Sequence, residues 1–250
     1  MKNSIIINLL LFVLISPVLA QQERFIRVSY IATPGSQYDM HADPERNDPK
    51  SLALANAYNF HASLIVNLQT QQAIYKVDSL VMGQIPKGME NVRRLINDSI
   101  AYVIKESPDN IIKYEKIFQR DFYSKGKQED LKWKITDNFR TMFGLNCRQA
   151  VPEEKDFLMN VWFTNDIPLM SGPMYFYNLP GLVVRAEDFF WTIELDAITY
   201  LSEEEFDFET EMNTYLEEFN ANKGENLLPE KQLYLEKAGL IRSMRSHIGY

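Results

Sequence analysis

The chain has 250 residues, of which 46% are hydrophobic, and its formal net charge is −8 at pH 7. This length suits one large domain or two small ones with a sizeable core. The acidity, without any block of Lys and Arg, excludes a nucleic-acid groove, which needs clustered cations to displace phosphate counterions. Cys147 is the only cysteine, which excludes an internal disulfide, so stability must come from packing.

The first twenty residues have the composition of a secretory signal. Lys2 precedes an apolar run over residues 5–15, and Val18 and Ala20 stand at the −3 and −1 places of a cleavage site. A membrane anchor would need about 20 apolar residues, more than this run supplies. Gln21, where a lipoprotein would have cysteine, argues against a lipid anchor. We therefore predict an exported protein, periplasmic or secreted, with no stable membrane span after cleavage.

Short runs rich in β-branched and aromatic residues predict a mainly antiparallel sheet. The expected strands are 25–31, 60–67, 72–78, 114–122, 131–135, 146–151, 155–163, 182–185 and 189–200. Hairpins are expected where short links join neighbouring runs, namely 60–67 with 72–78 and 146–151 with 155–163. The runs 114–122 and 131–135 are expected to flank a polar tip at 124–127.

Helices are expected at four places. A three- to four-residue apolar period predicts a helix over 89–105, and Asp48-Pro49 predicts a short one through residue 57, after an exposed polar loop. Ser202 and Glu205 form a capping-box pattern before an apolar stripe, and a last helix begins at 229. The predicted fold is α+β, a curved antiparallel sheet with an inserted helix and a helical C-terminal extension. The expected divisions are 1–20 (signal), 21–201 (β-rich domain) and 202–250 (acidic helical extension packed on it).

The candidate nucleophile is Cys147, which would need a base nearby in space. His41, His61 and His247 are all distant in sequence, and a buried structural thiol is the more common state of a free cysteine. His41 with Asp43 could suggest a metal site, but no second histidine lies at a ligand spacing. The eight carboxylates from 203 to 218 lack the spacing of a calcium loop. Carboxylate pairs such as Glu187-Asp188, or Asp166 with a partner, are a weak signal. We expect no cofactor and no metal.

The stretch 162–183, WFTNDIPLMSGPMYFYNLPGLV, holds three of the eleven prolines and two of the ten glycines. Such a density of turn residues fixes a backbone path rather than a chemistry. Together with the residues before it, this stretch resembles the signature of the GLPGLI family of exported Gram-negative proteins. The matching residues are Gly144, Cys147, Ala150, Trp162, Thr164, Ile167, Pro168, Gly172, Pro173, Phe176, Leu179, Pro180, Gly181 and Leu182.

Two positions depart from the family pattern. Asn178 replaces the leading glycine of the signature, and we predict that it keeps the turn because Asn tolerates positive φ. Gln149 stands where the family often has lysine. Within the signature, Trp162 and Phe176 are expected to pack below the turn made by 179–181.

The resemblance implies an exported envelope protein, often associated with outer-membrane functions, with no established enzymatic activity. We therefore expect a non-enzymatic binding or accessory protein whose partner is an outer-membrane protein, a peptide or an apolar small molecule. A curved sheet covered by helices can enclose a cavity for such a molecule, or its core can be filled. The alternative is a cysteine-dependent hydrolase that uses Cys147 with a distant histidine.

Overall fold

The structure is a computed structural model, and it describes residues 23–34, 58–83, 101–117, 120–157, 159–188, 191–224 and 227–248. Eleven strands are present: β1 (Phe25–Pro34), β2 (Tyr58–Asn67), β3 (Ala73–Met82), β4 (Ala101–Ser107), β5 (Asn110–Ile117), β6 (Arg120–Gly126), β7 (Trp133–Met142), β8 (Leu145–Pro152), β9 (Asn160–Thr164), β10 (Leu182–Glu187) and β11 (Trp191–Leu201). The helices within these ranges are η1 (Gln128–Asp130), a 3-10 turn, then α3 (Phe208–Asn222) and α4 (Glu230–Ile248).

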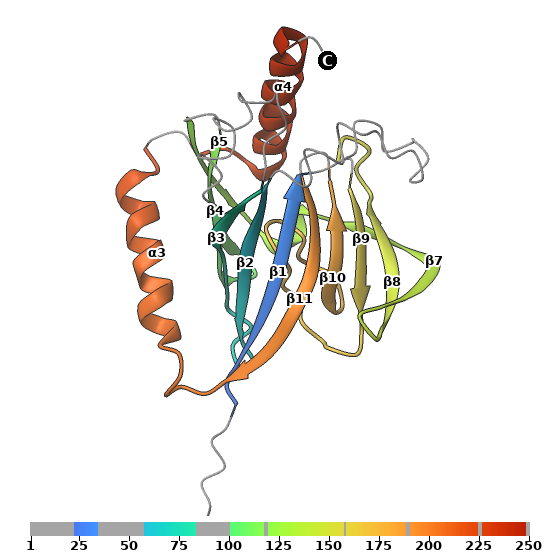
Figure 1. The fold of residues 1–250 in the computed structure, drawn as a ribbon. Coiled ribbons are helices and arrows are strands. Elements are labelled where there is room, and N and C mark those ends of the chain that lie inside the picture. Colours follow the sequence, from blue (N-terminus) through green and yellow to red (C-terminus); the bar gives the residue numbers. More distant parts are fainter. Residues whose placement is uncertain are drawn as a thin grey trace, which may run out of the picture.

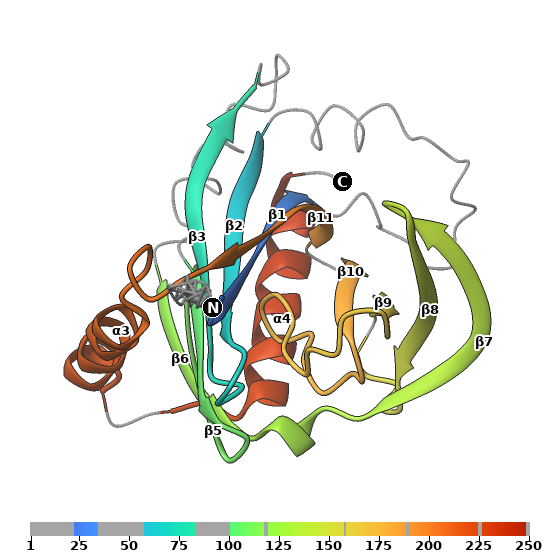
Figure 2. The ribbon, with the colours of Figure 1, turned by 90° about the horizontal axis from the view of Figure 1, so that it is seen from below.

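The strands form one open antiparallel sheet in the order β6-β5-β4-β3-β2-β1-β11-β10-β9-β8-β7 (Figure 1). The two strands at its edges, β6 and β7, follow each other in the chain and are joined by only six residues, 127–132. Eleven flat strands would be about 48 Å wide, whereas such a link spans roughly 25 Å. The sheet must therefore curl strongly, and Figure 2 shows it curving around α4.

The concave side of the sheet holds the larger core. In β1, Ile26, Val28, Tyr30 and Ala32 alternate with half-buried residues and point into this core. Helix α4 contributes Tyr234 and Ala238 to the same core. The irregular segment between β9 and β10 lies beside α4 within the curve (Figure 2). The concave side is therefore occupied by parts of the chain itself.

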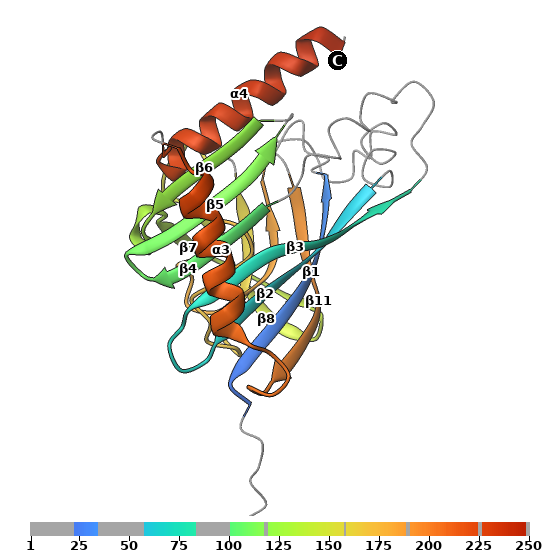
Figure 3. The ribbon, with the colours of Figure 1, turned by 90° about the vertical axis from the view of Figure 1, so that its left-hand side faces the viewer.

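A smaller core lies on the outer side of the sheet, under α3 (Figure 3). Phe208, Met212 and Phe219 are buried from the helix, and the Phe208 ring stacks on Phe25 of β1 at 5.2 Å. Their spacing is the helical stripe expected from the sequence, and the acidic residues Glu209 and Glu211 in the first turn suit the helix dipole. The outer side of β2–β5 is thus apolar next to α3, which explains why these strands are buried on both faces there.

The prediction of a helix over 89–105 is wrong for the described part, because residues 101–105 belong to β4. Val103 faces the concave core, while Tyr102 and Ile104 face the outer core. A strand buried on both faces is a continuous apolar run, and such a run cannot be distinguished from a helix by periodicity alone. Residues 89–100 lie outside the described residues.

The expected single strand 114–122 is also wrong, since the region contains both β5 and β6, which pair with each other. The expected polar tip at 124–127 does not join neighbouring strands. Ser124 belongs to β6, at one edge of the sheet, and the following strand β7 lies at the other edge. The predicted strand at 131–135 is the start of the longer β7.

The capping-box prediction is half correct. The Ser202 backbone N–H donates to the Glu205 carboxylate at 2.9 Å, and the Ser202 hydroxyl donates to the same oxygen at 3.0 Å. These bonds close a turn, however, and α3 begins only at Phe208, where the Asp207 carboxylate accepts from the Thr210 N–H at 3.1 Å. The chain needs the extra turn to pass from the end of β11 to the outer side of the sheet.

The two predicted hairpins are confirmed as β2–β3 and β8–β9, and the mainly antiparallel sheet is confirmed as well. The last helix begins one residue after Pro229 and continues through Gly239. The signal sequence, the loop with His41 and Asp43, and the helix expected near 48–57 lie outside the described residues.

Candidate functional site

The signature segment, defined here as residues 165–181, crosses the concave side of the sheet without regular secondary structure. Residues 171–177 are all buried, which is unusual for a loop because its backbone polar groups must then find partners. Several do so within the fold. The Trp133 indole N–H donates to the Tyr177 carbonyl at 2.7 Å, and the Leu182 N–H donates to the Ile167 carbonyl at 2.9 Å. The segment is therefore an integral part of the core.

Its two glycines allow close backbone contacts. A Cβ added at Gly172 would lie 1.7 Å from the Phe176 carbonyl oxygen, and one added at Gly181 would lie 1.9 Å from the Thr164 carbonyl oxygen. Real Cβ atoms do not make such contacts, so any side chain would force the backbone apart. The signature glycines are thus explained by packing.

Asn178 has a φ of 66°, which confirms the prediction that it keeps the turn. Its side chain also forms two hydrogen bonds that a glycine could not form. The Asn178 amide donates to the Leu131 carbonyl at 2.9 Å and accepts from the Gln128 amide at 3.3 Å. These two bonds tie the signature segment to the link between the sheet edges.

Most of the other signature residues are structural as well. Ala150, Phe176, Leu179 and Leu182 are buried in the concave core. Thr164 is also buried, and its hydroxyl accepts from the Asp166 N–H at 3.2 Å. Pro168 and Pro180 are exposed, Ile167 is half-buried, and Pro173 is buried and accepts from the Phe176 N–H at 3.0 Å.

Trp162 of β9 is half-buried and packs against the edge of the concave core, the core in which Phe176 is buried. The Arg140 guanidinium lies 5.3 Å from the centroid of the Trp162 ring. Gln149, the partner of Trp162 across the β8–β9 pair, hydrogen-bonds to Asn160 at 2.8 Å.

Cys147 is 1% exposed, and burial raises the pKa of its thiol, so the reactive thiolate is disfavoured. Its sulfur contacts the Leu145 carbonyl at 3.6 Å. His61 lies in β2, and four strands of the sheet separate β2 from β8. The side chains of His41 and His247 lie outside the described residues. The described geometry therefore provides no base for a Cys147 nucleophile.

Sequence reasoning missed a cluster of buried charges beneath α4. Lys113 Nζ lies 3.1 Å from both the Glu115 and the Glu230 carboxylates, and Lys237 Nζ lies 2.7 Å from Glu115. Tyr175 of the signature segment packs against both ammonium groups, at 4.0 Å from Lys113 and 5.6 Å from Lys237. Burial raises the pKa of Glu115, but Lys113 and Lys237 outweigh this and hold it below its usual value. The cluster connects β5, α4 and the signature segment.

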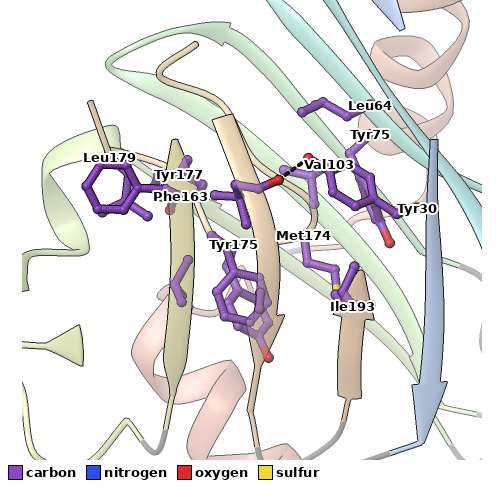
Figure 4. Packing of buried hydrophobic residues seen from close by; sticks show 14 of the residues in the cluster. Tyr30, Leu64, Tyr75, Val103, Phe163, Met174, Tyr175, Tyr177, Leu179 and Ile193 are labelled. Atoms are coloured by element: carbon purple, nitrogen blue, oxygen red, sulfur yellow. Dashed lines mark hydrogen bonds between the residues drawn. The ribbon is translucent and has the colours of Figure 1, made fainter. Parts of the chain in front are cut away.

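A second buried cation, Lys105 of β4, lies beside a small cavity. Its ammonium group donates to the Ser171 hydroxyl at 3.3 Å, and burial lowers its pKa to about 8. The cavity has a volume of about 10 Å³, which is room for one water-sized species. The lining residues are Leu64, Ala73, Tyr75, Val103, Lys105, Ile111, Ser171, Gly172, Met174 and Tyr177. Figure 4 shows several of these side chains packed between strands and signature segment.

Exposed apolar side chains gather on the β7 edge patch, defined as Ile135, Phe139 and Phe143, which are 37%, 70% and 56% exposed. Strand β7 pairs with β8 on one side, and its other side pairs with no strand of the described part. The opposite edge is different, because β6 bridges to Leu228 and contacts α4. Phe143 and Gly144 form the β7–β8 turn with φ values of 52° and 77°.

Other candidate groups have structural roles. Glu187 pairs with Arg185, and the Asp188 carboxylate accepts from the Trp191 N–H at 2.6 Å. Within the described residues, no three His, Cys, Asp or Glu side chains are grouped so as to hold a metal ion. No helix of that same part combines the length and the apolarity that a bilayer crossing requires.

Residues 105–185 match a family model described as "Protein of unknown function (Porph_ging)". This range contains every residue of the sequence signature from Gly144 to Leu182, but the family description assigns no activity. No curated protein matches the chain.

Solved structures give only distant likenesses. Two structures of PNGF-II, in space groups P21 and C2, are each 12% identical, with TM-scores of 0.45 and 0.46. They cover 83% and 85% of this chain, which spans only 31% and 32% of theirs. An uncharacterized conserved protein from Thermus thermophilus is 6% identical over 84% of this chain and 93% of its own, with a TM-score of 0.36. These likenesses assign no function.

Proposed function

We propose that this chain is an exported, non-enzymatic binding or accessory protein of the GLPGLI type that engages a partner protein through the β7 edge patch. The observation that carries the proposal is the contrast between the inside and the edge of the sheet. The described concave side is filled by α4 and the signature segment around a cavity of about 10 Å³, too small for an apolar ligand. Three of the eight large apolar side chains exposed in the described part, Ile135, Phe139 and Phe143, lie instead along the unpaired strand β7 and its turn.

The chemistry of the edge favours an extended protein segment. Unpaired N–H and C=O groups of an edge strand accept a further strand, and specificity comes from the side chains beside it. Residues 133–152 carry Lys134, Arg140 and Arg148 against the single carboxylate of Asp137, although the whole chain has a net charge of −8. The partner segment is therefore apolar with acidic residues. A lipid surface suits the edge less well, because unpaired backbone groups are not tolerated in hydrocarbon.

The proposal is tested by site-specific photo-crosslinking in cells that make the full chain. A photoreactive residue at Phe139 is expected to crosslink an extended acidic segment of one partner, and the same residue at Tyr200, which is 45% exposed at the far end of β11, is not. A second change, Thr141→Pro, blocks strand addition and should abolish the Phe139 crosslink. Equal crosslinking at both positions, or crosslinks only to lipid or to a second copy of this chain, would refute the proposal.

The alternative, a cysteine hydrolase that uses Cys147, predicts a different effect of replacing this cysteine. Cys147→Ala should leave the Phe139 crosslink and the biological function intact, whereas a cysteine hydrolase would lose its activity. The native thiol should also resist a thiol reagent until the protein unfolds. Export is tested independently by sequencing the N-terminus of the mature protein, which should begin at Gln21 and not at Met1.

A further inference from the structure

We propose that a β-bulge at residues 136–138 restricts strand addition to one half of β7, so that the partner segment pairs with residues 139–142 and not with residues 133–135. Residues 139–142 are called the tip half, because they lead into the β7–β8 turn, and residues 133–135 are called the base half. This inference rests on the proposed function and narrows the β7 edge patch to the part of it that binds.

The bulge interrupts the pairing of β7 with β8. Ile135 lies opposite Ala150, and Phe139 lies opposite Arg148. Between these two pairs, three residues of β7 stand against the single residue Gln149 of β8. A regular antiparallel pair has one residue against one, so β7 carries two extra residues here. Such extra residues bend the strand, and bulges at sheet edges often end the pairing in this way.

Side chains bond the backbone of the bulge and hold its shape. The Arg148 guanidinium donates to the Thr136 carbonyl at 2.7 Å, and the Asn138 N–H donates to the Thr136 hydroxyl oxygen at 3.3 Å. The Gln149 side-chain oxygen accepts from the Thr136 hydroxyl at 3.1 Å and from the Asn138 side-chain amide at 2.6 Å. An added strand could therefore bond the Thr136 carbonyl and the Asn138 N–H only by displacing these side chains.

The free backbone groups of the tip half follow from its turn. Phe143 and Gly144 form a two-residue turn with φ values of 52° and 77°. In such a hairpin the residue pair next to the turn exchanges backbone hydrogen bonds, and the pair after it does not. This alternation places the N–H and C=O groups of Thr141 and Phe139 on the free side of β7. An extended segment can bond these groups without crossing the bulge.

Exposure and contacts also favour the tip half. Phe139 and Phe143 are 70% and 56% exposed, whereas Ile135 in the base half is 37% exposed. At the start of the base half, Trp133 is half-buried, and its indole N–H donates to the Tyr177 carbonyl of the signature segment at 2.7 Å. The base half thus belongs to the packed part of the fold, while the tip half offers apolar side chains beside free backbone groups.

The charged groups of the tip half complement the chemistry of the segment. Arg140 belongs to this half, and the Arg148 guanidinium lies 5.3 Å from the centroid of the Phe139 ring. Acidic residues in the segment would be attracted to both guanidinium groups. The partner segment is therefore a short extended stretch, of the length of the tip half, that carries acidic residues next to apolar ones.

Photo-crosslinking in cells that make the full chain tests the inference at two positions. A photoreactive residue at Phe139 should crosslink a partner protein, whereas at Ile135 the yield should not exceed that of a chain without a photoreactive residue. Similar yields at the two positions would overturn the inference and leave the proposed function standing. No crosslink at Phe139 would refute the proposed function and this inference with it.

A deletion variant tests whether the bulge is the cause. Deleting Asp137 and Asn138 leaves Thr136 opposite Gln149, so the pairing of β7 with β8 becomes regular. The free edge should then continue into the base half, and a photoreactive residue at Ile135 should crosslink the partner. A deletion variant that crosslinks at Phe139 but not at Ile135 would overturn the inference. If the deletion variant does not fold, the comparison of the two positions in the wild type decides.

Asp137→Asn is the matched control, because it removes a charge from the bulge but no residue. The Asp137 side chain is 97% exposed, and its pair with Arg148 contributes little to stability, so the bulge should persist. Ile135 should therefore still give no crosslink in this variant. A crosslink at Ile135 in Asp137→Asn would show that charge, and not the bulge, excludes the partner from the base half, which would overturn the inference.

Discussion

Lys113 Nζ lies 4.0 Å from the centroid of the Tyr175 ring, so a strand cation and the signature segment are in direct contact inside the sheet. The same ammonium group pairs with Glu115 and Glu230. One carboxylate, Glu115 of β5, is shared between Lys113 of the same strand and Lys237 of α4, so it connects the sheet to α4. Tyr175 joins the signature segment to the same cluster.

The first prediction follows from that sharing. Glu115→Gln leaves the two lysines buried without their common carboxylate and should lower the free energy of unfolding by about 3–5 kcal/mol. Urea unfolding followed by tryptophan fluorescence measures this loss. Lys231→Ala is the control, since its pair with Glu154 is half exposed and its loss should barely change stability. Equal effects of both changes would contradict a special role of burial.

The second prediction concerns pH and Lys105. Its folded pKa of about 8 lies below the ordinary value of 10.5, so between these values the unfolded chain binds more protons and stability rises with pH. Lys105→Met removes this contribution and the cost of burying the charge. The variant should be the more stable protein at about pH 7.5, and its advantage should shrink as the pH rises to about 9.5. A stability difference between wild type and Lys105→Met that stays constant from about pH 7.5 to about pH 9.5 would contradict the lowered pKa of Lys105.

The third prediction separates the two roles of Asn178. Asn178→Gly keeps the positive φ but loses the bonds to Leu131 and Gln128, so stability should fall by about 1–2 kcal/mol. Asn178→Ala loses the same bonds and adds the strain of positive φ, which costs about 1 kcal/mol more. Urea unfolding should therefore rank wild type above Asn178→Gly, and Asn178→Ala last. A glycine variant as stable as wild type would mean that the side-chain bonds contribute nothing.

The fourth prediction compares two glycines. Gly181→Ala places a Cβ 1.9 Å from the Thr164 carbonyl oxygen and should cost more than about 4 kcal/mol or prevent folding. Gly239→Ala, in α4, meets nothing within 4 Å and should stabilise the protein by about 0.5–1 kcal/mol. The thermal unfolding midpoints of the two variants, compared with that of the wild type, measure both effects. Tolerance of Gly181→Ala would show that the signature turn can shift.

The fifth prediction addresses the tip of the β7–β8 hairpin. Phe143 has positive φ, which is strained for a bulky residue, yet its side chain is 56% exposed. Phe143→Asn should relieve the strain and raise stability by about 1 kcal/mol, because Asn suits this turn. If the exposed ring serves partner binding, the same change should weaken the Phe139 crosslink. A Phe143→Asn variant that is less stable than the wild type would show that the Phe143 ring packs against the rest of the protein.

The strands could be predicted from the sequence where one face of the strand is exposed to solvent. In β1 the alternation of buried and half-buried residues is visible in the sequence, and β2–β3 and β8–β9 were recognisable as hairpins. β4 was not, because both its faces are buried and its apolar residues form an unbroken run. The separation of β6 from β7 was also hidden, since local sequence does not encode how far a sheet curls.

Of the candidate site, the sequence indicated the signature turns but not the groups behind them. Asn178 was predictable because positive φ has few tolerant residues. Lys105 and Ser171 are 66 residues apart, and Glu115 and Lys237 are 122 apart, so no spacing rule connects them. A lysine that directly follows an apolar run, as Lys105 follows residues 101–104, is the one signal that could have indicated a buried cation.

The position of β1 in the sheet also constrains how the chain can fold. β1 lies at the centre, with β2 on one side and β11 on the other, and Phe25 pairs with Leu201. Strands β1–β6 can form a meander from local contacts as soon as they have been synthesised, but the free edge of β1 must wait for the last strand. Until β11 is available, the chain presents an unpaired, highly apolar strand to neighbouring molecules. Aggregation during folding should therefore depend most on how quickly residues 191–201 follow.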